Sequence, residues 1–162
     1  MRPIRSLMLC CALCLSAPAF SAAPAAPGDV AAIQDVVRQF QAAIIAKDGK
    51  TLGSLFLADH NSWLTVLDEA EYAKAKARNP KAAKVNSSTW KEFADFVSTA
   101  NVPVEEKFHN VRIETNGAVA SVYFDFDFLA DGKVTNRGSE AWQMVRHEQG
   151  WKIVAMVYSI GR

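Results

Sequence analysis

Three short turn sequences near the end of the chain constrain its fold more than any other feature. Asn116-Gly117 and Asp131-Gly132 are dipeptides that favour two-residue hairpin turns, and Gln149-Gly150 supplies a third turn. The segments around them have hydrophobic patterns with a period of two, which is typical of strands. These segments are residues 104–115, 118–129, 133–147 and 151–160. Strands joined by tight turns have to be antiparallel neighbours, so the sequence predicts a four-stranded antiparallel meander.

The chain before this meander has helical periodicity instead. Asp29 is the expected N-cap of a helix whose apolar residues recur every three or four positions up to Ile45. Gly49 is expected to adopt the left-handed conformation that ends this helix. A second short helix follows, with Leu52 and Phe56 on its apolar face.

One strand and two further helices are expected before the meander begins. Residues 62–67 alternate and are rich in strand-forming residues, whereas residues 69–78 and the segment after Ser88 or Thr89 have helical signals. Because the helices come mainly first and the sheet mainly later, the pattern indicates an α+β domain.

The N-terminus has the pattern of a secretory signal. Arg2 and Arg5 precede an apolar run over residues 7–15 that is too short to span a bilayer, and small residues follow it. We therefore expect export to the periplasm or the extracellular space, with no stable membrane anchor. The expected organisation is a signal peptide at 1–23, a linker at 24–28 and one domain at 29–162.

Cleavage of this signal changes the chemistry available to the protein. Cys10, Cys11 and Cys14 are the chain's three cysteines, so the exported form has no disulfide, thiolate nucleophile or cysteine-bound zinc. Without Arg2 and Arg5 the 18 basic residues fall to 16 against 17 acidic ones, and the net charge changes from +1 to −1. This charge argues against a nucleic-acid partner. No metal-binding or phosphate-binding motif is present, so we expect no metal and no cofactor.

The order of elements resembles that of the NTF2-like superfamily, named after nuclear transport factor 2, which includes SnoaL-like, DUF4440-like and ketosteroid-isomerase-like proteins. The segments that carry the resemblance are FQAAIIAKDGKTLGSLF at 40–56 and RGSEAWQMVRHEQGWKIVAMVYS at 137–159. The resemblance implies a cone, in which N-terminal helices pack in a strongly curved antiparallel sheet whose open end forms a pocket. It also implies a homodimer formed through the outer face of the sheet. This fold hosts many functions, so the resemblance indicates fold more than activity.

Several polar residues are candidates for catalysis. Phe40 occupies the position where the isomerase branch places a tyrosine, which disfavours a ketosteroid-type reaction. Asp59 and His60 follow the second helix and can act as a base near neutral pH, or simply cap that helix. Glu140 is a pocket acid if the face of Trp142 points inward and a surface residue if it does not; the hairpin register leaves both open.

The resemblance also directs attention to aromatic residues and to the last strand. Phe124 and Phe126 share a strand face that is expected to be the core face. The expected pocket walls are Trp63, Trp90, Phe124, Phe126 and Trp142. The last strand is apolar on both faces, so one face needs a cover. We expect that cover to be a second copy of the chain, contacting Val154, Met156 and Tyr158.

The leading hypothesis is an exported protein that holds a small hydrophobic ligand in its cone without catalysis. One alternative is an isomerase, cyclase or dehydratase that uses Asp59 or His60 as its base. The other alternative is an interaction module whose cone is plugged by side chains.

Overall fold

A computed structural model describes residues 26–161. The expected signal peptide at 1–23 lies outside the described residues. The elements in chain order are α1 (Pro27–Ala46), α2 (Gly49–Ser54), β1 (Ser62–Leu67), α3 (Glu69–Arg78), β2 (Val85–Ser87), α4 (Trp90–Thr99), β3 (Val104–Thr115), β4 (Val119–Ala130), β5 (Lys133–His147) and β6 (Gly150–Ile160). The α+β class and the four long strands therefore match the expectation from sequence.

The strands form one curved sheet in the order β2-β1-β6-β5-β4-β3. The meander β3 to β6 is antiparallel throughout, as its tight turns require. The expectation of an antiparallel sheet is wrong at one place, because β1 pairs in parallel with β6 and Leu64 lies opposite Val157. The chain between β1 and β6 is long and contains helices, so no tight turn imposes an antiparallel pairing there.

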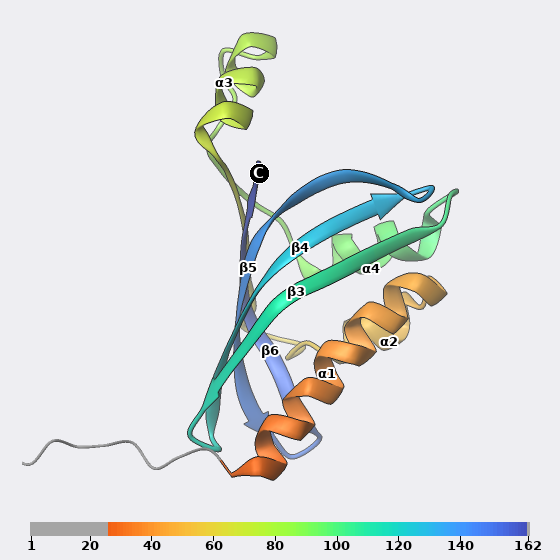
Figure 1. Ribbon diagram of the computed structural model, residues 1–162, viewed down its shortest axis with the longest axis vertical. Helices are drawn as coiled ribbons and strands as arrows, with labels where there is room; N and C mark the ends of the chain where they lie inside the picture. The colour runs from red at the N-terminus through yellow and green to blue at the C-terminus, as the bar shows by residue number, and fades with distance from the viewer. Residues whose placement is uncertain (1–25, 162) are drawn as a thin grey trace, which may run out of the picture.

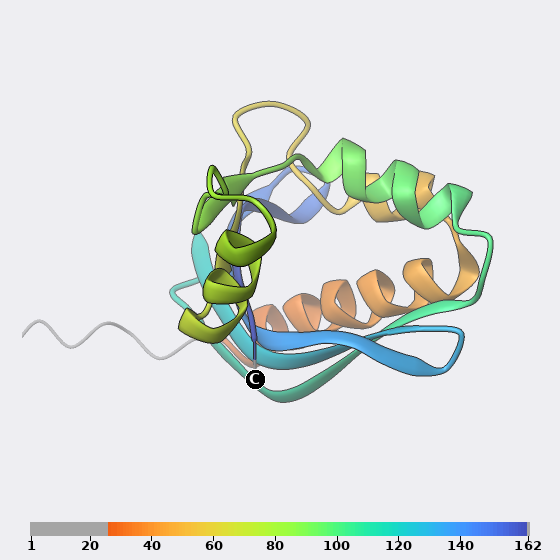
Figure 2. The same ribbon diagram turned by 90° about the horizontal axis from the view of Figure 1, so that it is seen from above.

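The sheet bends around a concave side, and Figure 2 shows it curling toward α1 and α4. Irregularities in β5 and β6 assist the bend. The register shifts opposite Phe128 and opposite Gln143, so that Thr135 and Val154 are extra residues in their strands. At Gly138 the backbones of β5 and β6 approach closely, because an added Cβ would lie 1.8 Å from the carbonyl oxygen of Ser159.

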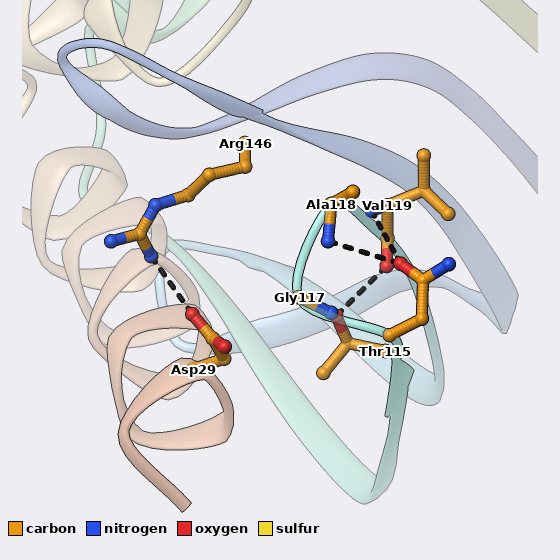
Figure 3. A network of polar contacts seen from close by, with 7 residues as sticks. Asp29, Thr115, Gly117, Ala118, Val119 and Arg146 are labelled. Atoms are coloured by element: carbon orange, nitrogen blue, oxygen red, sulfur yellow. Dashed lines mark hydrogen bonds and ion pairs between the residues drawn. The ribbon is translucent and has the colours of Figure 1, made fainter. Parts of the chain in front are cut away.

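Helix α1 lies along the concave side of the sheet, and its apolar face forms much of the core (Figure 1). It begins at Pro27, a favourable first helical residue, and not after the expected N-cap Asp29. The Asp29 carboxylate instead accepts a hydrogen bond from Arg146 of β5, with 3.0 Å between Oδ1 and Nη1 (Figure 3). Gly117, also labelled in Figure 3, lies close to this pair, because a Cβ added to it would be 3.3 Å from Oδ2 of Asp29. The contact connects the start of α1 to the end of β5.

Gly49 does not end α1, in contrast to the expectation from sequence. Lys47 adopts the left-handed conformation there, with φ of 55°, and Gly49 is the first residue of α2. A Cβ on Gly49 would lie 2.5 Å from the carbonyl oxygen of Ala94 in α4. The glycine therefore allows α2 and α4 to pack closely.

Helix α3 stands apart from the body of the domain, as Figure 1 shows. It is capped by Asp68, whose side chain accepts a hydrogen bond from the backbone N–H of Glu71, and none of its residues is buried. None of the helices among residues 26–161 is long and apolar enough to cross a membrane.

Candidate functional site

The concave side of the sheet and the helices enclose a cavity of about 380 Å³, which we call the aromatic cavity. Its lining is mainly aromatic, with two glutamates and a few small or polar side chains. The lining residues are Phe40, Trp63, Phe93, Phe96, Glu106, Phe126, Phe128, Ala130, Thr135, Asn136, Glu140, Met156 and Tyr158. The volume is within the range of cavities that hold small organic molecules.

The aromatic cavity has a buried end and an exposed end. Phe40 and Met156 are almost completely buried, whereas Phe96 is 49% exposed and Thr135 is exposed. Phe96 lies against Phe128, with 6.1 Å between ring centroids. The cavity therefore opens near Phe96 and Thr135 and is closed near Phe40 of α1.

Glu140 lies at the buried end, and its side chain is 4% exposed. The structure thus settles the open question of β5, because the face that carries Glu140 and Trp142 points inward. The indole Nε1 of Trp142 donates a hydrogen bond to the Glu140 carboxyl. Burial raises the pKa of Glu140 to about 8, although this hydrogen bond opposes the increase. A carboxylic acid that stays protonated near neutral pH can donate a hydrogen bond.

Glu106 on β3 is a second buried acid that the sequence analysis missed. It is 5% exposed, and burial followed by repulsion from Glu140 raises its pKa well above the usual range. The sequence contained a signal for this acid, because Glu106 lies two residues from both Val104 and Phe108 and so shares the inward face of the strand with them. An acid on an apolar strand face is unusual and suggests a site.

The expected pocket walls are divided among three places. Trp63 and Phe126 line the aromatic cavity. Phe124 and Trp142 are inward-facing but fully buried in the core, where Trp142 packs against Phe40 with 4.8 Å between ring centroids. Trp90 lines a different depression on the outside of the domain.

Asp59 and His60 also line that outer depression, together with His147 and Lys152. Both residues are exposed and neither lines the aromatic cavity. They lie in the connection between α2 and β1. The structure therefore does not bring these two candidates to the cavity where a ligand would be enclosed.

The set of β6 residues that points inward shifts by one position within the strand, and two of the expected interface residues therefore face inward. Trp151 and Ile153 are buried, but after the extra residue Val154 the buried side chain is Met156, and Tyr158 lines the aromatic cavity. The expectation that Met156 and Tyr158 face outward is therefore wrong, because the bulge shifts the period-two alternation by one residue. Val154 is partly exposed.

The outer face of the sheet carries polar pairs at one end. Asp127 contacts Arg137, with 3.1 Å between Oδ1 and Nε, and His109, with 3.3 Å between Oδ2 and Nε2. Asp125 accepts a hydrogen bond from Ser139 at 2.7 Å. No group of three or more potential metal ligands is present among residues 26–161.

These features define a class of protein: an α+β cone with a pocket between its helices and the concave side of its sheet. That architecture is the NTF2-like fold, also called cystatin-like. No protein-family model and no curated protein matches the sequence. The fold assignment therefore rests on solved structures.

Three solved structures illustrate the similarity. An NTF2-like protein of unknown function from Shewanella baltica has a TM-score of 0.59 and 17% identity, covering 83% of this chain and 95% of that chain. A candidate dehydratase of the NTF2-like family from Streptomyces avermitilis has a TM-score of 0.59 and 20% identity, covering 83% and 97%. A candidate aromatic ring hydroxylase from Novosphingobium aromaticivorans has a TM-score of 0.60 and 18% identity, covering 85% and 92%. At these identities the similarity establishes the fold and leaves the activity open.

Proposed function

We propose that this protein binds a small, largely apolar molecule in the aromatic cavity, with the polar end of the ligand at Glu140 and Glu106. The observation that carries the proposal is a cavity of about 380 Å³ with aromatic walls and two buried carboxyl groups. Apolar walls with a few well-placed polar groups are the usual composition of a ligand site. A cone plugged by side chains, as an interaction module would have, does not fit this cavity.

The experiment compares ligand binding in two neighbouring variants. Thr135 is exposed and lines the aromatic cavity, whereas Val134 is exposed and does not line it. We expect Thr135→Trp to obstruct the cavity and to weaken binding of a small aromatic ketone such as acetophenone, measured by ligand-observed NMR. Val134→Trp is the matched control and should bind normally. Equal binding by both variants and the unmodified chain would place the ligand elsewhere.

Acid–base catalysis is a second candidate function, favoured by the raised pKa values of Glu106 and Glu140. Two coupled carboxyl groups can hold one proton between them, so that one group donates and the other accepts. The expected assay is exchange of the acetophenone methyl protons in deuterium oxide. Catalysed exchange that disappears in Glu140→Gln would support an enzyme, and exchange at the uncatalysed rate would leave binding alone.

We also propose that the chain is exported and that two copies of it pair through the outer face of the sheet. One row of paired residues crosses four neighbouring strands of the sheet. It consists of Tyr123 on β4, Ala141 on β5, Val157 on β6 and Leu64 on β1. Tyr123 is 38% exposed and Val157 is 40% exposed, and both alternate with inward-facing neighbours. This apolar row, which we call the outer row, replaces Met156 and Tyr158 as the expected dimer contact.

A further inference from the structure

The lining of the aromatic cavity has an unusual balance of charge. Seven aromatic side chains and two glutamates contribute to it, and no lysine, arginine or histidine does. The aromatic residues come from α1, β1, α4, β4 and β6. They are Phe40, Trp63, Phe93, Phe96, Phe126, Phe128 and Tyr158. Negative charge inside this cavity therefore has no positive partner from the lining.

The two carboxyl groups are not neutralised from elsewhere in the described part of the chain. No ion pair among residues 26–161 includes Glu106 or Glu140. The neighbouring Lys107 is exposed and pairs instead with Glu105, at 3.8 Å between Nζ and Oε2. Glu106 is 5% exposed, and within residues 26–161 the hydrogen bond that it accepts from the Gln41 side chain goes to its backbone carbonyl oxygen. Its carboxyl group is therefore open to a ligand in the cavity.

Aromatic rings and carboxylates favour the same kind of ligand. The faces of Phe, Tyr and Trp rings carry partial negative charge and attract cations, and the attraction strengthens when the cation is removed from water. A carboxylate adds direct attraction to a cation and repels an anion. A neutral ligand uses only the apolar part of this environment, and an anionic ligand is repelled by both parts.

We propose, building on the ligand-binding function above, that the aromatic cavity selects a small organic cation, an apolar amine or quaternary ammonium. Its charged end lies between Glu106 on β3 and Glu140 on β5. Its apolar part contacts the rings of Trp63, Phe93 and Phe126.

Proton release accompanies binding of such a cation. Burial raises the pKa of Glu140 to about 8, so this carboxyl group is largely protonated near neutral pH in the empty cavity. Burial also raises the pKa of Glu106 well above its usual range. The other titratable group in the lining is Tyr158 of β6, whereas α1, α4, β1 and β4 contribute no charged side chain to it. The cation replaces a proton, and its affinity therefore rises with pH.

The test compares two ligands of the same shape and different charge. Phenyltrimethylammonium carries a charge that does not depend on pH, and tert-butylbenzene is its neutral counterpart. At pH 8 we expect the cation to bind about tenfold more tightly or better, measured by ligand-observed NMR. Between pH 6 and pH 8 its affinity should rise up to about 100-fold for one proton released, with no such change for tert-butylbenzene.

Variants identify the groups responsible. Glu106→Gln combined with Glu140→Gln should remove the pH dependence and reduce the preference for the cation to the part that the aromatic rings supply. Binding of tert-butylbenzene should persist, which also shows that the variant is folded. Glu114→Gln changes an exposed glutamate on the same strand as Glu106 and should change nothing. Tighter binding of the neutral ligand would overturn cation selectivity and leave ligand binding standing. Failure of the cation, tert-butylbenzene and acetophenone alike would overturn both proposals.

Discussion

Glu106 and Glu140 line one cavity from opposite sides of β4, where Phe126 lies between them in the sheet register. Glu106 is opposite Phe128 and Glu140 is opposite Phe124, so the two acids come from strands that do not pair with each other. The curvature of the sheet directs both side chains toward the same space, and burial followed by the charge of Glu140 raises the pKa of Glu106. This arrangement is the most informative feature of the molecule, because buried acids without a cationic partner reduce stability unless they are protonated or bind a ligand.

The first prediction concerns stability and pH. Glu140 has a pKa of about 8 in the folded protein, against a usual value of 4.5. Between these values the folded state holds more protons than the unfolded state, so the free energy of unfolding falls as pH rises. We expect a loss of about 1.4 kcal/mol per pH unit for each such carboxyl group, and no loss from it below pH 4.5. Glu140→Gln should flatten this decline in urea unfolding from pH 5 to pH 8; an unchanged decline would contradict the raised pKa.

The second prediction concerns Gly138, where the backbones of β5 and β6 approach closely. Gly138→Ala places a Cβ against the Ser159 carbonyl oxygen, and the two backbones have to separate. We expect a loss of about 3 kcal/mol or more in the free energy of unfolding. Gly28→Ala is the control, since nothing lies within 4 Å of a Cβ added there. Similar unfolding free energies for the two variants would show that the two strands accommodate a Cβ at position 138 without a large cost.

The third prediction concerns Asp59 and His60, which are exposed and lie outside the aromatic cavity. Asp59→Asn and His60→Gln should each leave the affinity for acetophenone within about twofold, because sites that share no contacts behave independently. Ligand-observed NMR on the purified variants measures this. A large loss of affinity in either variant would return these residues to the site.

The fourth prediction concerns the outer row. If two copies pair through it, Val157→Lys places a charge in the apolar contact and should raise the dimer dissociation constant about 100-fold or more. Val134→Lys changes an exposed valine on β5 outside the outer row and serves as the control. Analytical ultracentrifugation distinguishes the two outcomes. A protein that sediments as a monomer at all concentrations would reject the pairing itself.

Local patterns along the chain were sufficient for most of the fold. The turn at Asn116-Gly117, the shared strand face of Phe124 and Phe126 and the helix over 69–78 each depend on residues close together in sequence. Such interactions produce the same local structure wherever the segment lies, so they can be predicted from the residues alone. The resemblance of two segments to NTF2-like proteins was enough to predict the cone.

The site depended on relationships that cross the chain. The extra residue at Val154 reversed the alternation in β6 and turned Met156 and Tyr158 inward, and a single bulge of this kind leaves no clear mark in the hydrophobic pattern. Parallel pairing of β1 with β6 followed from long-range packing, because the intervening chain imposes no direction.

The sequence by itself determined an α+β domain, its meander and a face rich in phenylalanine, because turns and periodicity are local properties. Only the tertiary structure decided that Glu106 and Glu140 meet at one aromatic cavity while Asp59 and His60 lie outside it. The physical reason is the curvature of the sheet, which brings together strands that are not neighbours and buries their two acids among aromatic side chains.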